Sequence, residues 1–89
     1  MMYLIQEIQN VFPQMRAFFT QKQWENFLAC PFEELHIYHF SLGTWIRNTL
    51  LVEGSILKDA FCAINILQKD DMSALMIQLL YIRYKEKER

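Results

Sequence analysis

A histidine, a glycine and an arginine recur at helical spacing inside an otherwise apolar run. The histidine and the arginine have side chains that could take part in catalysis or ligand binding. His39, Gly43 and Arg47 stand four residues apart, so on an α-helix they form one slowly drifting stripe. A histidine can act as an acid or a base near neutral pH, and an arginine can hold an anion. With Asp70 or Asp71 as an orienting carboxylate, this set would suit a small-ligand or nucleotide-processing site.

The same residues also fit a structural role, which the sequence favours. An arginine on the inward stripe of a helix needs partners, because an unpaired buried charge is costly. We predict that Arg47 bonds to Asp70 or Asp71, that one of these acids caps the last helix, and that Gly43 lets another helix approach closely. The expected polar network consists of His39, Gly43, Arg47, Asn48, Asp70, Asp71 and Ser73.

Other sites with catalytic or metal-binding chemistry are not indicated. His36 and His39 are three residues apart, but no carboxylate or cysteine stands at a spacing that would complete a metal site. Cys30 and Cys62 are too few and too far apart for a zinc site or a disulfide framework. There is no glycine-rich phosphate loop. We therefore expect no metal, no cofactor and no catalytic residue.

Composition narrows the class of protein. Of 89 residues, 53% are hydrophobic and 15% aromatic, which is high for this size, so the excess should fill a dense core or form a patch that a partner covers. A net charge of −1 argues against non-specific nucleic-acid binding. No apolar run is long enough to span a bilayer and no basic leader is present, so we expect a cytoplasmic protein that does not enter membranes.

Apolar periodicity predicts an all-α fold, a compact single domain of four or five helices over residues 1–89, because no segment alternates with period two. An N-terminal helical segment over 1–19 should end or kink at Pro13. Thr20 and Gln23 have capping-box form and should open the next helix. Residues 85–89 form a charged tail.

The longest helix is expected from about 32 to about 51, at the centre of the core, with Pro31 suited to its first turn. Ser55 should cap a further helix whose apolar period runs from Ile56 to Leu67, and 68–71 should form the loop before the last helix. The expected inner side of the central helix consists of Phe32, Leu35, His36, His39, Leu42, Ile46 and Leu50.

Two motifs resemble a bacterial family of small all-helical domains of unknown function. The first is H-x-x-L-G-x-x-I-R-N over residues 39–48, and the second is D-D-M-S over residues 70–73. The resemblance covers a core of residues 20–84. It implies an all-helical fold and carries no assigned activity.

Two hypotheses for function follow. The first is a non-enzymatic protein-binding module, such as an immunity or antitoxin-like inhibitor or a self-associating protein, with a protein partner or a second copy as its ligand. The alternative is the small-ligand or nucleotide-processing site described above. That alternative predicts a concave pocket that exposes at least two of the side chains His39, Arg47 and Asp71.

Overall fold

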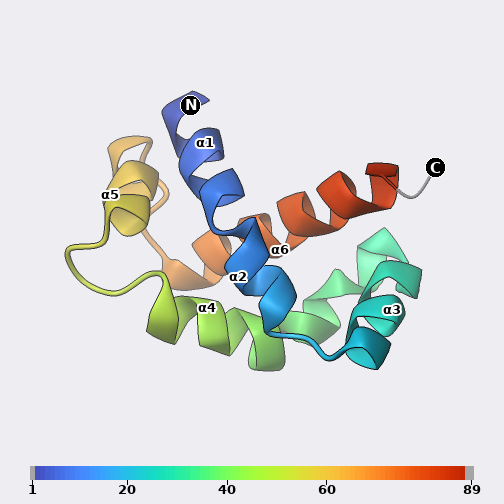
Figure 1. The fold of residues 1–89 in the computed structure, drawn as a ribbon. Coiled ribbons are helices and arrows are strands. Elements are labelled where there is room, and N and C mark those ends of the chain that lie inside the picture. The colour runs from blue at the N-terminus through green and yellow to red at the C-terminus, as the bar shows by residue number, and fades with distance from the viewer. Residues whose placement is uncertain (1, 88–89) are drawn as a thin grey trace.

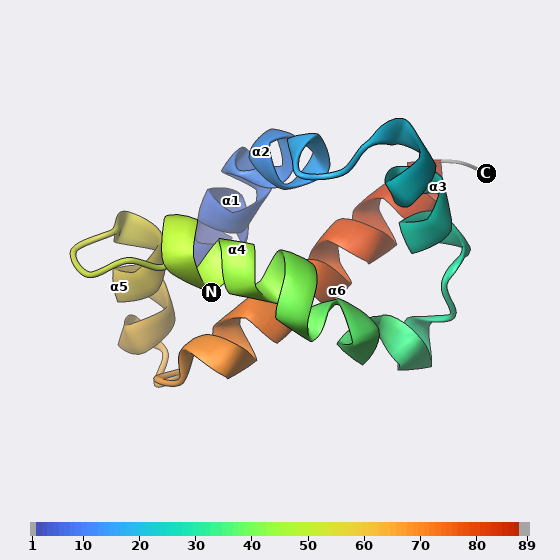
Figure 2. The ribbon, with the colours of Figure 1, turned by 90° about the horizontal axis from the view of Figure 1, so that it is seen from below.

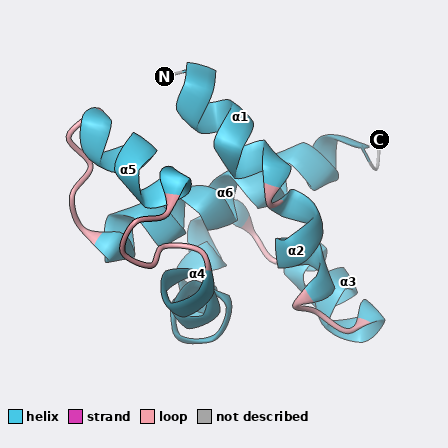
Figure 3. Cartoon of the chain, turned by 60° about the vertical axis from the view of Figure 1, so that its left-hand side comes forward, coloured by secondary structure: helices cyan, strands magenta, loops and turns pink. Residues whose placement is uncertain are grey.

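Helices account for most of the chain in the computed structural model, which describes residues 2–87 (Figure 1). The elements are α1 Met2–Asn10, α2 Phe12–Ala17, α3 Gln21–Ala29, the 3₁₀-helix η1 Phe32–Tyr38, the π-helical turn η2 His39–Gly43, α4 Thr44–Thr49, α5 Ile56–Ala63 and α6 Lys69–Lys87. The helices α1 and α2 are joined by a break at Val11 and form one bent rod. The elements η1, η2 and α4 follow one another directly and form a second rod, the central rod. With α3, α5 and α6 this makes five rods, joined by short loops (Figure 3), and the predicted all-α fold is confirmed.

Local sequence signals place several helix ends. The break between α1 and α2 precedes Pro13, which lies in the first turn of α2, where a missing N–H costs little. Thr20 Oγ1 accepts a hydrogen bond from Gln23 N at 3.1 Å, and Gln23 Oε1 accepts one from Thr20 N at 2.9 Å, so the predicted capping box is present. Ser55 Oγ accepts from the backbone of Lys58 at 3.1 Å and caps α5, as predicted.

The central rod is wound differently from the single α-helix that we expected over 32–51. Pro31 stands just before η1 in an extended conformation, not inside its first turn. In η1 three residues complete a turn, so side chains three apart share a face. The resulting stripes are Phe32, Leu35 and Tyr38 toward the core; Glu33, His36 and His39 beside it; and Glu34, Ile37 and Phe40 outermost.

This winding corrects the expected inner side of the rod. Leu35, Leu42 and Ile46 are buried as predicted. Phe32 and His36 are exposed instead, and His39 and Leu50 are only half-buried. The prediction placed side chains about 100° apart, whereas a 3₁₀-helix advances them by about 120°, which takes His36 off the stripe of Leu35. Phe32 is exposed at the first residue of η1, and His39 and Leu50 lie beyond the 3₁₀-helix, in η2 and at the end of α4.

Two further boundaries differ from expectation. The apolar period ran to Leu67, but α5 ends at Ala63, because Asn65 adopts a left-handed conformation with φ 68° that reverses the chain. The last helix begins at Lys69, inside the predicted loop, so Asp70 and Asp71 stand in its first turn rather than capping it. Their charges are favourable there, at the positive end of the helix dipole.

The helix α6 runs through the middle of the molecule, with α5 beside its start and α3 near its end (Figures 1 and 2). The central rod runs antiparallel to it. Phe32 lies against Tyr81 at 6.1 Å between ring centroids, whereas Arg47 reaches Ser73. Lys85, in the predicted charged tail, belongs to α6 and donates to the Leu28 carbonyl at 2.6 Å; residues 88–89 lie outside the described part.

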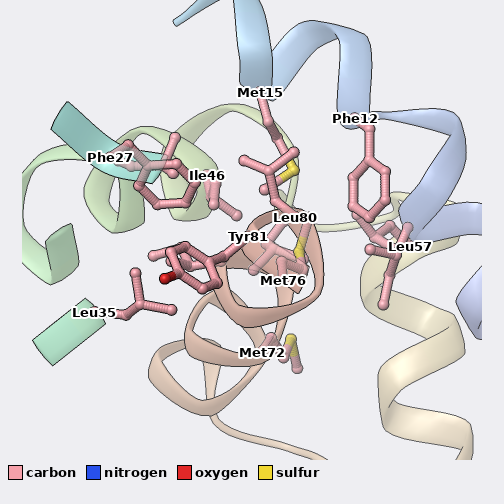
Figure 4. Close-up of a cluster of buried hydrophobic side chains, with 14 of the residues drawn as sticks. Phe12, Met15, Phe27, Leu35, Ile46, Leu57, Met72, Met76, Leu80 and Tyr81 are labelled. Carbon is pink, nitrogen blue, oxygen red and sulfur yellow. The ribbon is translucent and has the colours of Figure 1, made fainter. Parts of the chain in front are cut away.

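The core gathers around α6 (Figure 4). Met72, Met76 and Leu80 project from this helix into the packing and are fully buried. They meet Ile46 from the central rod and Met15 from α2, both of which are also fully buried. One core thus joins the N-terminal rod, the central rod and the last helix, which fixes the surface that η1 and α6 present together.

Candidate functional site

Arg47 is the hub of a polar network between the central rod and α6. Its Nη1 donates to Ser73 Oγ at 3.1 Å, and its Nη2 donates to Thr44 Oγ1 at 3.0 Å and to the His39 carbonyl at 3.4 Å. Its Nε lies 3.6 Å from Asp70 Oδ1, so the predicted contact with one of the two acids is present. With its side chain only 17% exposed, Arg47 binds three elements together.

Gly43 lies beside this guanidinium. A Cβ placed on Gly43 would stand 3.0 Å from Arg47 Nη1 and 3.8 Å from Ile77 Cδ1 of α6. The second distance is ordinary van der Waals contact, whereas the first is tight. Gly43 therefore makes room chiefly for the Arg47 side chain, and less for the approach of another helix that we predicted.

The structure does not bring every predicted network residue together. Asp71 and Asn48 are exposed, and their side chains make no hydrogen bond or ion pair to the described residues 2–87. Asp70 is 70% exposed, so its contact with Arg47 lies at the surface rather than in the core. Ser73 is fully buried and donates to the Asp70 carbonyl at 3.1 Å, so it belongs to the network as predicted.

His39 contributes its backbone to the network and its imidazole to a neighbouring groove of about 290 Å³. We name this the η1–α6 groove; it is lined by Leu35, His36, His39, Phe40, Ala74, Ile77 and Gln78. The Phe40 side chain is 85% exposed, and its ring meets the His39 ring edge-on at 5.0 Å. Neither Arg47 nor Asp71 lines the groove, so the pair of exposed groups that the small-ligand hypothesis required is not found there.

Sequence reasoning missed the outer wall of this groove. Phe40 lines the groove and lies three residues after the exposed Ile37, and neither residue is on the inner side predicted for an α-helix. The two histidines spaced by three, with Glu33 three residues earlier, were the available signal. That spacing alone indicates an incomplete metal site. Among the described residues, no group of three potential ligands could hold a metal ion.

Four exposed carboxylates stand on the two rods that form the groove, Glu33 and Glu34 on η1 and Asp70 and Asp71 in the first turn of α6, although none of them lines it. We name these four residues the acidic rim. The charges of two of them, Glu33 and Glu34, act on Cys30 at the end of α3. Burial, with added repulsion from the nearby charges of Glu34 and Glu33, raises the pKa of the Cys30 thiol. The thiol is thereby kept protonated near neutral pH, which makes it inert as a nucleophile.

The chain was also compared with known proteins. A family described as "Domain of unknown function (DUF6794)" matches residues 6–84, which includes most of the N-terminal segment as well as the core. No curated protein and no solved structure matches the chain. Within residues 2–87, every helix is too short or too polar to cross a lipid bilayer.

Proposed function

The chain belongs to the DUF6794 family, and on that premise we propose that it is a non-enzymatic protein-binding module whose contact surface is the η1–α6 groove. The observation that carries this proposal is the exposure of Phe40, at 85%, on the wall of a largely apolar groove. Ile37 and Phe32, on the preceding helix η1, are also exposed, although neither lines the groove. Contiguous apolar patches of this kind mark interaction sites, and aromatic side chains are common anchors of protein interfaces.

The polar residues nearby support a structural role over a catalytic one. All three nitrogens of the Arg47 guanidinium have partners within the protein, and the Ser73 hydroxyl is buried and bonded. These internal bonds support a role of the two side chains in holding the fold together. At about 290 Å³, the groove is also at the lower end of the roughly 300–1,000 Å³ typical of small-molecule sites.

An inhibitor of the immunity or antitoxin type is one class of module that would use such a surface, by covering a site on a partner protein. Self-association would place a second copy on the same surface. Both roles need the apolar side chains on η1 and η2 to be accessible, which they are in this structure.

Site-specific photo-crosslinking in the cell that expresses the protein tests the proposal. A benzophenone amino acid replaces Phe40 in one variant and Tyr3, 60% exposed on α1, in a matched control. We expect one discrete adduct from position 40 that the control does not give. Equal adducts from both positions, or none from position 40, would overturn the proposal.

A titration followed by NMR separates this proposal from the small-ligand alternative. Inorganic phosphate and nucleotides are added while the backbone amide signals of His39, Arg47 and Asp71 are observed. We expect these signals to stay in place, because the side chains do not converge on one pocket. Saturable shifts at two of the three positions would favour the small-ligand site and count against the binding module.

A further inference from the structure

The two ends of the η1–α6 groove are both acidic. Because the central rod and α6 are antiparallel, Glu33 lies toward the Tyr81 end of the groove, and Asp71 lies toward the Arg47 end. Glu33 stands one 3₁₀ turn before His36, and Asp71 stands one α-helical turn before Ala74. Each carboxylate therefore lies about one turn before a residue that lines the groove.

These charges are largely uncompensated. Within residues 2–87, Glu33, Glu34 and Asp71 form no ion pair, and Asp70 contacts only Arg47. Arg47 already serves three further acceptors. Lys85 lies 5.8 Å from the Tyr81 ring and donates to the Leu28 carbonyl, so a cation is present at that end. A partner that covers the groove would still meet carboxylates without an ion pair on both rods.

The groove also has the form that suits a helix. Its two walls are helical rods, its floor is Leu35 and Ile77, and Ala74 leaves space in the middle. The structure has no sheet in residues 2–87, so a partner strand has no edge to extend. A common mode that fits a groove between two helical rods is an amphipathic helix that lays its apolar side chains into it.

We infer that the η1–α6 groove binds an amphipathic α-helix of a partner protein that carries lysine or arginine on both sides of its apolar face. This inference rests on the proposed function and specifies its ligand. Apolar side chains of the helix occupy the space beside Phe40 and Ala74, and its basic side chains reach Glu33 at one end and Asp71 at the other. Charge complementarity of this kind speeds association and selects the partner.

Two fluorescent helical peptides test the inference. They share one apolar face of leucine and phenylalanine, and they differ only in flanking residues, which are lysine in one peptide and glutamate in the other. In fluorescence anisotropy at low salt we expect the lysine peptide to bind at least about tenfold more tightly, since several rim contacts act together. The difference should shrink as salt is added.

Variants locate the effect on the protein. Glu33→Lys combined with Asp71→Lys should remove the preference for the lysine peptide. Glu25→Lys combined with Asp59→Lys changes the net charge equally but lies on α3 and α5, and should keep the preference. Ala74→Trp, which fills the groove from an exposed position, should weaken binding of the lysine peptide about tenfold or more.

The outcomes separate this inference from the proposed function. If both peptides bind equally, or if the charge-reversed variant keeps its preference, the basic helix is wrong, while a crosslink at position 40 would still support a protein-binding surface. If binding is unchanged by Ala74→Trp, the groove is not the binding site. Sedimentation that shows a dimer, lost on Phe40→Ala, would assign the groove to a second copy and overturn the inference.

Discussion

A single side chain, that of Arg47, joins the consecutive elements η2 and α4 to the distant helix α6. Its guanidinium donors are divided between the His39 carbonyl, the Thr44 hydroxyl and the Ser73 hydroxyl, with the Asp70 carboxylate at the outer end. A planar fork with five N–H groups can serve such a set, whereas a lysine ammonium cannot. The network therefore depends on the shape of the arginine as well as on its charge.

Replacing Arg47 by alanine should lower the free energy of unfolding by about 1–3 kcal/mol, the range for losing hydrogen bonds to a largely buried charged group. The larger loss of about 3–5 kcal/mol for a broken buried pair does not apply, because Asp70 is 70% exposed. Arg47→Lys should recover part of the loss. Urea denaturation measures both.

The control for this series is Asp70→Asn, which removes only the exposed partner and should change the unfolding free energy by less than about 1 kcal/mol. If Arg47→Ala unfolds within about 0.5 kcal/mol of the wild type, the network does not stabilise the fold. A loss equally large in Asp70→Asn would show instead that the surface ion pair dominates.

At the scale of the elements, the capping signals could be predicted from the sequence and the winding of the central rod could not. Thr20 and Ser55 act on backbone groups only three residues away, so their pattern is visible in a short window. The choice between α, 3₁₀ and π winding shifts each hydrogen bond by one residue. Contacts beyond a single turn, such as the bond from Arg47 to the His39 carbonyl eight residues earlier, belong to the balance that sets the winding.

Gly43 and Arg47 should be coupled energetically. In the wild type, Gly43→Ala places a Cβ 3.0 Å from Arg47 Nη1 and displaces a bonded guanidinium, so we expect no gain in stability or a loss. In an Arg47→Ala background the obstruction is gone, and the same substitution should stabilise the helix by about 0.5–1 kcal/mol. A double-mutant cycle in urea measures the difference.

Asn48→Ala is a matched control for the cycle, since its exposed side chain lies on the same rod outside the network. Its effect should be equal with and without Arg47. If Gly43→Ala has the same effect in both backgrounds, Arg47 is not the reason for a glycine at this position.

At the scale of the whole molecule, aromatic residues divide between a core and a surface. Phe27 is fully buried, and its ring lies 5.0–5.7 Å from the rings of Phe19, Trp24, Tyr38 and Tyr81. High aromatic content predicted either a dense core or a patch that a partner covers, and the structure has a dense aromatic core together with exposed aromatic side chains such as Phe40. Which aromatic residue belongs to which could not be predicted in η1, because the assignment depends on the number of residues per turn.

Phe27→Ala should therefore lower the free energy of unfolding by about 3–5 kcal/mol, as for other buried aromatic residues. Phe40→Ala removes a side chain that is 85% exposed and should change it by less than about 0.5 kcal/mol. Thermal and urea unfolding of the two variants provide the comparison. A large loss of stability in Phe40→Ala would mean that the residue belongs to the fold and not to a contact surface.

The winding of η1 also constrains how the length of this segment could change during evolution. Deleting or inserting one residue of η1 before His36 would rotate the side chains between that change and His36 by about 120° relative to the rest of the rod. This rotation would move a buried leucine onto the surface or a glutamate into the core. A change of three residues would restore all three stripes. Relatives of this chain should therefore differ in length here in steps of three, whereas an ordinary α-helix accommodates changes of three or four residues.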